Sequence, residues 1–456
     1  MNQLTYQEAL DWIHGIGKSA GIRPGLERMH TLLDKMGNPQ QQLKCVHIGG
    51  TNGKGSTAST MAYVLEKAGY RVGLYTSPYL ESFTNRMSIN GKDITPQELA
   101  REVSNLRPLV EEVSSIPELG QVTEFEVVTA LAFRYFANHH PDVVILEVGL
   151  GGRLDATNVI TPMVSIITNV SREHVDYLGE EISGIAGEKA GIIKEGVPVV
   201  TAAENPEVLQ VIKEKAREKK APLCRVLPSW LKEGTENNPH GELLEEERVF
   251  YGERRVHAEG QFFSYRGKSG EYRDLFLSLL GDYQVVNAAT ALAGLEFLKE
   301  RGYTITQESM REGLGEVCWP GRMELVRHSP RVVLDGAHNP AAVDQLSHAL
   351  KEHFSYNKLI LVLGILKDKD ASRMLGSLVP MAERVLVTYP PVFRGTDPKD
   401  IAEKARAFTE APVEVVPEIP GAVDKALGLA SPEDLVLICG SLYVVADARK
   451  YLTQPR

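Results

Sequence analysis

Apolar positions along this chain form short runs that alternate with segments of helical spacing. Strands are expected in the runs at 43–48, 71–76, 142–148 and 163–170. After the first run, Met61, Val64, Leu65 and Ala68 recur every three or four positions, which indicates a helix. Further helices are expected at 123–139, 205–219 and 284–300. The runs DVVILEV and MVSIITNV are largely apolar throughout, as in a parallel sheet covered on both faces. The alternation predicts an α/β fold with right-handed crossovers.

Turn and cap signals mark where elements and domains begin. Thr95-Pro96-Gln97-Glu98 is a capping box with proline at the first helical position, so a helix is expected to start there. The polar, acidic stretch at 229–247 indicates a solvated excursion, and it lies within a β-rich segment at about 223–282. A second α/β unit is expected, with strands at 331–337, 358–366, 384–390 and 434–441. Pro320 and Gly321 mark the join, which predicts domains at 1–318 and 322–456.

Composition narrows the class of protein. With 456 residues, of which 43% are hydrophobic and 24% charged, the chain resembles a soluble globular protein with more than one core. Its net charge of -10 disfavours nucleic-acid binding, which requires a basic surface. The four cysteines show no pairing pattern, so reduced thiols are expected. The sequence has no signal-peptide pattern and no apolar stretch of about 18 residues, which predicts a cytoplasmic protein without a membrane span.

The stretch GGTNGKGST at 49–57 lies between the first predicted strand and its helix. A strict P-loop, G-x-x-x-x-G-K-[ST], would need glycine and a hydroxyl residue where this chain has Ile48 and Gly55. Backbone N–H groups of a glycine turn and a helix N-terminus nevertheless favour an anion, and Lys54 adds a full positive charge. Ser56 and Thr57 add hydroxyls suited to oxygen or Mg²⁺ contacts. The stretch predicts a phosphate-binding loop, and a plain glycine turn with a solvent-exposed lysine is the alternative.

Glu147 and His174 each follow an apolar run and are expected at the same edge of the sheet as the glycine-rich loop. Ligands of open α/β sheets lie at this carboxyl edge. A carboxylate, an imidazole, a hydroxyl and nucleotide phosphates together would suit Mg²⁺ or Mn²⁺, although structural roles in turns fit both residues as well. Gly149-Leu150-Gly151 begins a dinucleotide fingerprint, but its third glycine would fall at Leu154, which disfavours that ligand.

Three further residues fit either a functional or a structural role. On sequence alone Lys189, in IAGEKAGIIKEG, is an ordinary helix lysine. Asp335 follows a strand and can accept hydrogen bonds from ribose hydroxyls. His338 precedes a helix that starts with proline. Turn-forming or capping roles are equally consistent with Asp335 and His338.

Together these segments resemble the folylpolyglutamate synthases and dihydrofolate synthases, relatives of the peptidoglycan-building Mur ligases. The matching motifs are GTNGKGS at 50–56, TSPYL at 76–80, INGKDI at 89–94, TEFEVVTALAF at 123–133, LEVGLGGRLDATNVI at 146–160, IAGEKAGIIK at 185–194, QVVNAATAL at 284–292, WPGRME at 319–324, LDGAHNP at 334–340 and GSLYV at 440–444. They run in order along nearly the whole chain. The resemblance implies a P-loop-type parallel-sheet ATP-binding domain plus a smaller, Rossmann-like α/β C-terminal domain that binds glutamate.

The resemblance also implies a role for individual residues. The ATP phosphates would lie on the loop formed by Thr51, Asn52, Gly53, Lys54, Gly55 and Ser56. ATP would also be contacted by Asn287, Arg322 and Asp335. Two Mg²⁺ sites would be formed by Ser77, Glu147, His174 and Lys189, the last carbamylated by CO₂. The substrate side would comprise Ser77, Pro78, Tyr79, Arg86, His338 and Ser441. Lys54, Lys189 and His338 are the residues expected to act in catalysis.

The activity implied is ATP-dependent ligation of L-glutamate to a folate, through an acyl phosphate, by a monomer. Dihydropteroate is a second candidate substrate. The chain departs from the family pattern at Tyr79, Asn85 and Glu173, where His, Glu and Asp are common, and the first two lie in the segment expected to cover the folate. A Mur-type amino-acid ligase acting on a cell-wall precursor, a P-loop kinase and a nucleotide-binding regulatory module are the alternatives.

Overall fold

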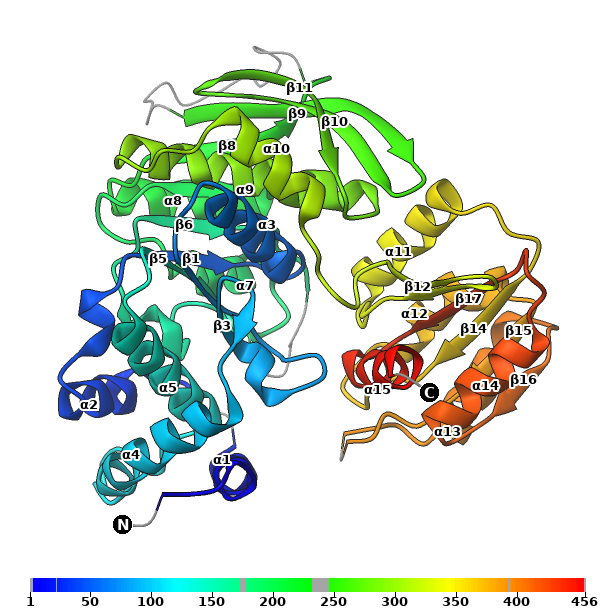
Figure 1. The fold of residues 1–456 in the computed structure, drawn as a ribbon, viewed down its shortest axis with the longest axis horizontal. Helices are drawn as coiled ribbons and strands as arrows, with labels where there is room; N and C mark the ends of the chain where they lie inside the picture. Colours follow the sequence, from blue (N-terminus) through cyan, green and yellow to red (C-terminus); the bar gives the residue numbers. More distant parts are fainter. Residues whose placement is uncertain (1–2, 22, 173–177, 232–245, 393, 455–456) are drawn as a thin grey trace.

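The computed structural model describes residues 3–21, 23–172, 178–231, 246–392 and 394–454, and its strands form two separate sheets (Figure 1). The first sheet has the strand order β11-β10-β9-β8-β7-β6-β1-β5-β2-β3-β4. Its parallel part consists of β2 (Val72–Tyr75), β5 (Val143–Glu147), β1 (Cys45–Gly49), β6 (Val164–Ile167), β7 (Val199–Thr201), β8 (Leu223–Pro228) and β9 (Glu246–His257). The antiparallel edges are β10 (Gly260–Gly267) with β11 (Gly270–Leu277), and β3 (Met87–Ile89) with β4 (Lys92–Asp93).

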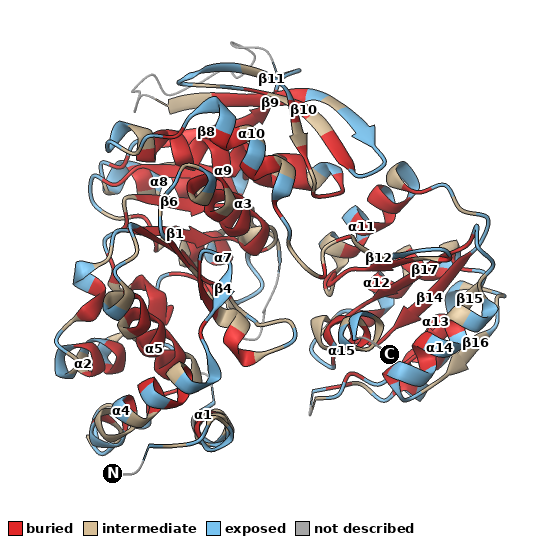
Figure 2. Cartoon of the chain, viewed as in Figure 1, coloured by how far each residue is buried: buried red, intermediate tan, exposed pale blue. Residues whose placement is uncertain are grey.

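Helices cover both faces of this sheet, as the apolar runs predict. Every residue of β1, β5 and β6 is buried. One face packs against α3 (Lys54–Lys67), α9 (Asp282–Glu300) and α10 (Gln307–Glu316). The other face packs against α1 (Tyr6–Ala20), α2 (Glu27–Lys35), α4 (Pro96–Ser114), α5 (Glu124–His139), α7 (Ile182–Ala190) and α8 (Pro206–Glu218). Figure 2 shows the buried sides of these helices turned toward the strands.

Local signals place several helix ends where they are observed. The capping box at the start of α4 is present, because Glu98 N donates to Thr95 Oγ1 at 3.2 Å and Thr95 N donates to Glu98 Oε2 at 3.0 Å. Gly69 follows α3 with a φ of 89°, a left-handed conformation that suits a helix stop. The predicted start of α4 is therefore confirmed.

The second sheet has the order β12-β13-β17-β14-β15-β16. It comprises β12 (Glu324–His328), β13 (Arg331–Leu334), β17 (Leu435–Cys439), β14 (Leu359–Leu363), β15 (Arg384–Val387) and β16 (Val413–Val415). All neighbouring pairs are parallel except β12 with β13. One face is covered by α11 (Pro340–His353), α12 (Ala371–Leu378) and α13 (Pro398–Ala405), and the other by α14 (Ile419–Leu429) and α15 (Leu442–Thr453).

The predicted division at 318–322 falls in the connection between α10 and β12, where the chain passes from one sheet to the other, and it stays a proposal. The β-rich segment extends the first sheet through β8 and β9 rather than forming a body of its own. Most of the polar stretch at 229–247 lies outside the described residues. No helix in the described part of the chain is long and apolar enough to cross a membrane.

Candidate active site

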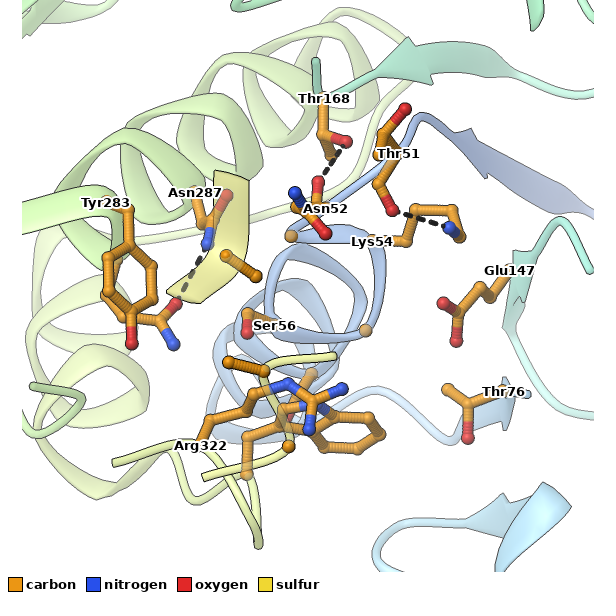
Figure 3. A pocket seen from close by; sticks show the side chains of 18 of the residues that line it. Thr51, Asn52, Lys54, Ser56, Thr76, Glu147, Thr168, Tyr283, Asn287 and Arg322 are labelled. Atoms are coloured by element: carbon orange, nitrogen blue, oxygen red, sulfur yellow. Dashed lines mark hydrogen bonds between the residues drawn. The ribbon is translucent and has the colours of Figure 1, made fainter. Parts of the chain in front are cut away.

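The glycine-rich loop connects β1 to α3, as its sequence predicts. Gly53 precedes the helix with a φ of 84°, and Lys54 is the first helical residue. The Lys54 amine donates to the carbonyls of Gly50 and Thr51 at 2.9 and 3.0 Å, and Figure 3 shows the bond to Thr51. These bonds hold the positive charge of Lys54 against the backbone of the loop. The first N–H groups of α3 have no partner within the helix, which together with the lysine favours binding of an anion.

The turn after β6 holds this loop from the side. Thr168 Oγ1 donates to Asn52 O at 2.7 Å, and Asn52 N donates to Asn169 Oδ1 at 2.9 Å. Thr51 N donates to the Asn169 carbonyl at 2.8 Å. These contacts fix the backbone of the loop before any ligand binds, which is the preorganisation that phosphate binding needs.

Two glycines of the loop are closely packed by residues from other segments. A Cβ atom on Gly53 would lie 2.2 Å from Asn287 Oδ1, and one on Gly55 would lie 2.6 Å from the Trp319 ring. At either position a side chain would displace its neighbour, and the φ of 84° at Gly53 would also strain the backbone of any other residue. The departure from the strict P-loop at Gly55 therefore has a steric cause, because Trp319 occupies the space that a serine or threonine would need.

Glu147 ends β5 directly beside β1, where it is the register partner of Ile48. Its side chain is buried, and among the described residues only Ser77 N, at 3.1 Å, donates a hydrogen bond to the carboxylate. Burial raises the pKa of Glu147, and the charges of Lys54 and Arg322 oppose that shift. A buried carboxylate that faces cations without a direct ion pair suits an oxygen ligand for a divalent cation.

Lys189 lies on α7, is 1% exposed, and its amine donates to the Gly50 carbonyl at 2.9 Å. The Gly50 carbonyl therefore accepts hydrogen bonds from both Lys54 and Lys189. His174 lies outside the described residues, so its predicted place beside Glu147 stays a prediction. Within the described ranges no group of three or more His, Cys, Asp or Glu side chains gathers at one point.

The second sheet contributes Asp335, which follows β13. Its two oxygens accept from Ala337 N at 2.7 Å and Met323 N at 2.8 Å, so the carboxylate ties the connection at 319–324 to the sheet. Burial raises the pKa of Asp335, and the neighbouring Arg322 opposes this shift. The charge of Arg322 opposes the rise in pKa of both Glu147, at the end of β5, and Asp335, after β13 of the other sheet.

The loop that carries His338 contacts the glycine-rich loop. His338 is half-buried and its Nδ1 lies 2.7 Å from the Gly336 carbonyl. The next residue, Asn339, caps α11 and donates from Nδ2 to Asn52 Oδ1 at 3.0 Å. Ser441 is buried and caps α15, where its hydroxyl accepts from Tyr443 N at 3.2 Å.

The segment after β2 begins with a cis bond between Ser77 and Pro78. The Arg86 guanidinium lies 5.2 Å from the Tyr79 ring centre and 5.3 Å from that of Phe83, within the range of cation–π attraction. Asn85 accepts from the backbone N–H groups of Glu81 and Ser82 and donates to Asp93 Oδ2 at 2.6 Å. The Asn85 amide is therefore part of the fold of this segment, and a carboxylate in its place would be repelled by Asp93.

One cavity of about 870 Å³ joins these parts. Its lining includes Thr51, Asn52, Gly53, Lys54, Gly55, Ser56, Ser77, Pro78, Tyr79, Glu147, Asn287, Arg322, Asp335 and His338. The predicted site residues Arg86, Lys189 and Ser441 lie outside the lining. Sequence reasoning missed Thr168, Asn169, Tyr283 and Trp319, which also line it. Trp319 begins the family motif WPGRME, and Tyr283 directly precedes the family motif QVVNAATAL. These two motifs are the sequence signals that could have identified both residues.

Comparison with known proteins agrees with this geometry. The Mur ligase middle domain matches residues 48–295, and the glutamate ligase domain of Mur ligases matches residues 321–442. The chain is 39% identical to the dihydrofolate synthase/folylpolyglutamate synthase of Bacillus subtilis, over 98% of this chain and 99% of the relative. It is 36% identical to the folylpolyglutamate synthase of Lacticaseibacillus casei, again over 98% of this chain and 99% of the relative.

A solved structure supports the same assignment. The folylpolyglutamate synthase of Mycobacterium tuberculosis, complexed with ADP and AMPPCP, matches with a TM-score of 0.87 and 33% identity over 98% of both chains. The two domain matches cover the two sheets described above, and the glycine-rich loop lies at the start of the first match. The chain therefore belongs to the folylpolyglutamate synthase and dihydrofolate synthase family, a group of ATP-dependent ligases built from Mur ligase domains.

Proposed function

We propose that this chain adds L-glutamate to a tetrahydrofolate at the expense of ATP, and that dihydropteroate is a second substrate. The observation that carries the proposal is the hydrogen bond between Asn339 and Asn52 at 3.0 Å. It brings the loop that carries His338 against the phosphate loop, within one cavity that also contains Glu147. A ligase needs this juxtaposition, because the activated carboxyl group and the incoming amine must meet where water is excluded.

The nucleotide would bind with its phosphates on residues 51–56 and its remaining parts against Asn287, Arg322 and Asp335. The lysine charge and the loop N–H groups support phosphate binding, and the Asp335 carboxylate suits hydroxyl donors. Arg322 lies close enough to affect the pKa of carboxyl groups on both sheets, so it would join the nucleotide to the second domain. The cavity is formed by one chain, which supports a monomer as the working unit. A stable dimer in sedimentation experiments would contradict this. We also propose that the protein is cytoplasmic.

Mg²⁺ would be held by Glu147 and the Ser77 hydroxyl, with His174 and a modified Lys189 as further ligands. The fit rests on the buried Glu147 carboxylate and on the Ser77 N–H that orients it. When bound, the ions would screen the negative charge of the phosphates and of the substrate carboxylate. The loop serine at position 56 is a weaker candidate, because Gly55 stands at the position where a strict P-loop presents its metal-binding hydroxyl.

The reaction follows from these parts. The folate carboxylate attacks the γ-phosphorus of ATP, ADP leaves, and an acyl phosphate remains. Lys54 and the loop N–H groups hold the phosphates in line while charge moves to the leaving ADP. The neutral amine of glutamate then attacks the acyl carbon, the tetrahedral intermediate expels phosphate, and the amine proton passes to solvent or a nearby base. The phosphate leaving group makes amide formation favourable.

The proposal is tested by incubating the chain with ATP, tetrahydrofolate and labelled glutamate. One ADP and one phosphate should appear for each labelled glutamate incorporated into folate, and a parallel reaction with dihydropteroate tests the second substrate. ADP without labelled folate would point to a phosphotransfer or hydrolysis activity. No turnover with any folate or pteroate would favour a Mur-type ligase on a cell-wall precursor or a regulatory module.

Replacing His338 by alanine is expected to raise the KM for glutamate by about tenfold or more, the effect of losing a hydrogen bond to a charged group. The Kd for ADP should stay within about twofold, since His338 belongs to the loop before α11 and not to the phosphate loop. Steady-state kinetics and calorimetry measure the two quantities. His348→Ala, which removes an exposed histidine from the adjoining helix α11, is the matched control. Equal losses in glutamate use and ADP binding would contradict the assignment.

Carbamylation of Lys189 is expected to make activity depend on CO₂. The neutral amine would attack the carbon of CO₂, form an N–C bond and lose a proton, which turns a cation into an anionic oxygen ligand. The proximity of the amine to Gly50 O supports a role at the phosphate loop. Rates measured in CO₂-free buffer should fall and should recover when bicarbonate is added. An unchanged rate would show that Lys189 acts as an ordinary buried amine that donates to the loop backbone.

A further inference from the structure

Arg449 joins three parts of the chain that are far apart in sequence. It lies on α15, and its Nε donates to both oxygens of Glu324 on β12 at 2.9 Å. Its Nη1 donates to Glu81 Oε1 at 2.5 Å, and Glu81 belongs to the segment 77–86 that follows β2 of the first sheet. One arginine therefore binds a carboxylate on a strand of the second sheet and a carboxylate in the segment that follows β2 of the first sheet. Arg449 and Glu81 also line the cavity that contains the phosphate loop.

The segment 77–86 rests on the second domain through apolar contacts as well. Leu80 packs against the hydrophobic cluster that includes Val445 of α15. A Cβ atom on Gly321 would lie 3.4 Å from Leu80 Cδ1, so the tip of the segment touches the connection between the domains. Glu81 and Leu80 are adjacent in the chain. Glu81 binds Arg449 of α15, and Leu80 packs against a cluster that α15 helps to form. The ion pair and the apolar contact thus hold the same turn.

Glu324, the second partner of Arg449, also binds the connection between the two sheets. Glu324 Oε2 accepts from Gly321 N at 2.8 Å, next to Arg322 in the chain. Among the partners of Arg449, the side chains of Glu81 and Glu324 are 30% and 16% exposed, against 23% for the arginine itself. Partial burial and shared hydrogen bonds reduce the screening that makes most surface ion pairs weak.

We propose that Glu81 and Arg449 are positioning residues that hold the segment 77–86 against the second domain, in the conformation that accepts folate. The inference rests on the proposed function, because it assumes that this segment covers the folate. Neither residue touches the reacting atoms. Their effect would pass through Ser77, Pro78 and Tyr79, which line the cavity on the same segment.

The first test is Glu81→Gln in the full chain. We expect the KM for tetrahydrofolate to rise about threefold to tenfold, because loss of the ion pair releases the segment, while kcat and the KM for ATP stay within about twofold. The melting temperature should be unchanged, since the pair lies at the edge of the cavity and outside both cores. Glu111→Gln removes an exposed carboxylate paired with Arg107 on α4 and is the matched control. An unchanged folate KM, or a uniform loss of all parameters, would overturn the proposal.

A double-mutant cycle identifies the partner. Arg449→Met should raise the folate KM at least as much as Glu81→Gln, because it also releases Glu324. Combining the two changes should add little beyond Arg449→Met alone. Arg449→Lys should restore only part of the effect, because an ammonium group cannot bind two carboxylates as a planar guanidinium does. Simple addition of the two single effects would overturn the pairing.

Hydrogen exchange distinguishes failure of this inference from failure of the proposed function. In the ligand-free chain, amides of residues 77–86 should exchange about threefold faster in Glu81→Gln than in the parent protein, while α4 is unchanged. This measurement does not depend on turnover. A parent chain without glutamate incorporation would reject the proposed function, whereas equal exchange in both chains would reject the positioning role.

Discussion

Replacing Glu147 by glutamine is expected to lower kcat/KM for ATP by about two to three orders of magnitude, as when one preorganised charge-stabilising group is removed. The amide has the shape of the carboxylate and can still accept from Ser77 N, which donates to Glu147 at 3.1 Å. What it lacks is the negative charge beside the phosphate loop that would bind a divalent cation. The half-saturating Mg²⁺ concentration should therefore rise at least about tenfold.

Stability should respond in the opposite direction to activity. Burial raises the pKa of the Glu147 carboxyl in the folded chain, so its ionised form destabilises the fold at neutral pH, where the unfolded chain also carries the charge. A neutral amide removes that cost, and the melting temperature of Glu147→Gln should equal or exceed that of the parent chain. A loss of activity without a loss of stability would mark Glu147 as a residue retained for function.

The matched variant is Ser56→Ala. Ser56 lies in the same loop, but Gly55 stands where a strict P-loop presents its hydroxyl, so the dependence of rate on Mg²⁺ should change by less than about threefold. Activity measured across a range of Mg²⁺ concentrations compares the two variants directly. A larger shift for Ser56→Ala than for Glu147→Gln would move the metal to the loop and reject the role of Glu147.

Features that depend on nearby residues were predicted well from the sequence. The buried strands β1, β5 and β6 appear as apolar runs because both of their faces are covered by helices. The capping box at Thr95 is a local pattern of four residues, and the start of α4 follows from it. The common sheet edge of the glycine-rich loop and Glu147 follows from parallel pairing, in which strand ends align.

Features that depend on packing between distant segments were not predicted. Trp319 packs against Gly55, although more than half of the sequence separates the two residues. The periodicity of neither segment predicts that contact. The bond from Asn339 to Asn52 and the pairing of Arg449 with Glu81 likewise join one sheet to the other. Sequence pattern indicates which residues lie inside an element, whereas such contacts depend on how two folded units meet.

The contact between Trp319 and Gly55 gives the strongest prediction about the phosphate loop. Gly55→Ser would restore the hydroxyl of a strict P-loop, yet it is expected to lower kcat by about a hundredfold, the effect of displacing catalytic groups by about 1 Å. Its Cβ would lie 2.6 Å from Trp319 Cζ2, so the ring or the start of α3 must move. The overpacking should also cost about 1–3 kcal/mol of unfolding free energy, measurable by denaturant titration.

Gly55→Ala separates the two effects of the serine, because it adds the same Cβ without the hydroxyl. If steric pressure dominates, alanine and serine should impair ATP turnover to a similar degree, and the loss should shrink when Trp319→Leu removes the ring edge that they meet. If instead the hydroxyl completes a metal site, serine should bind Mg²⁺ and ATP at least as well as the parent chain while alanine does not. That second outcome would show that glycine is not required at position 55. It would also count against Glu147 and Ser77 as the main metal ligands. We expect the first, because the Trp319 ring packs against the first core, and a side chain at position 55 must displace either that ring or the start of α3.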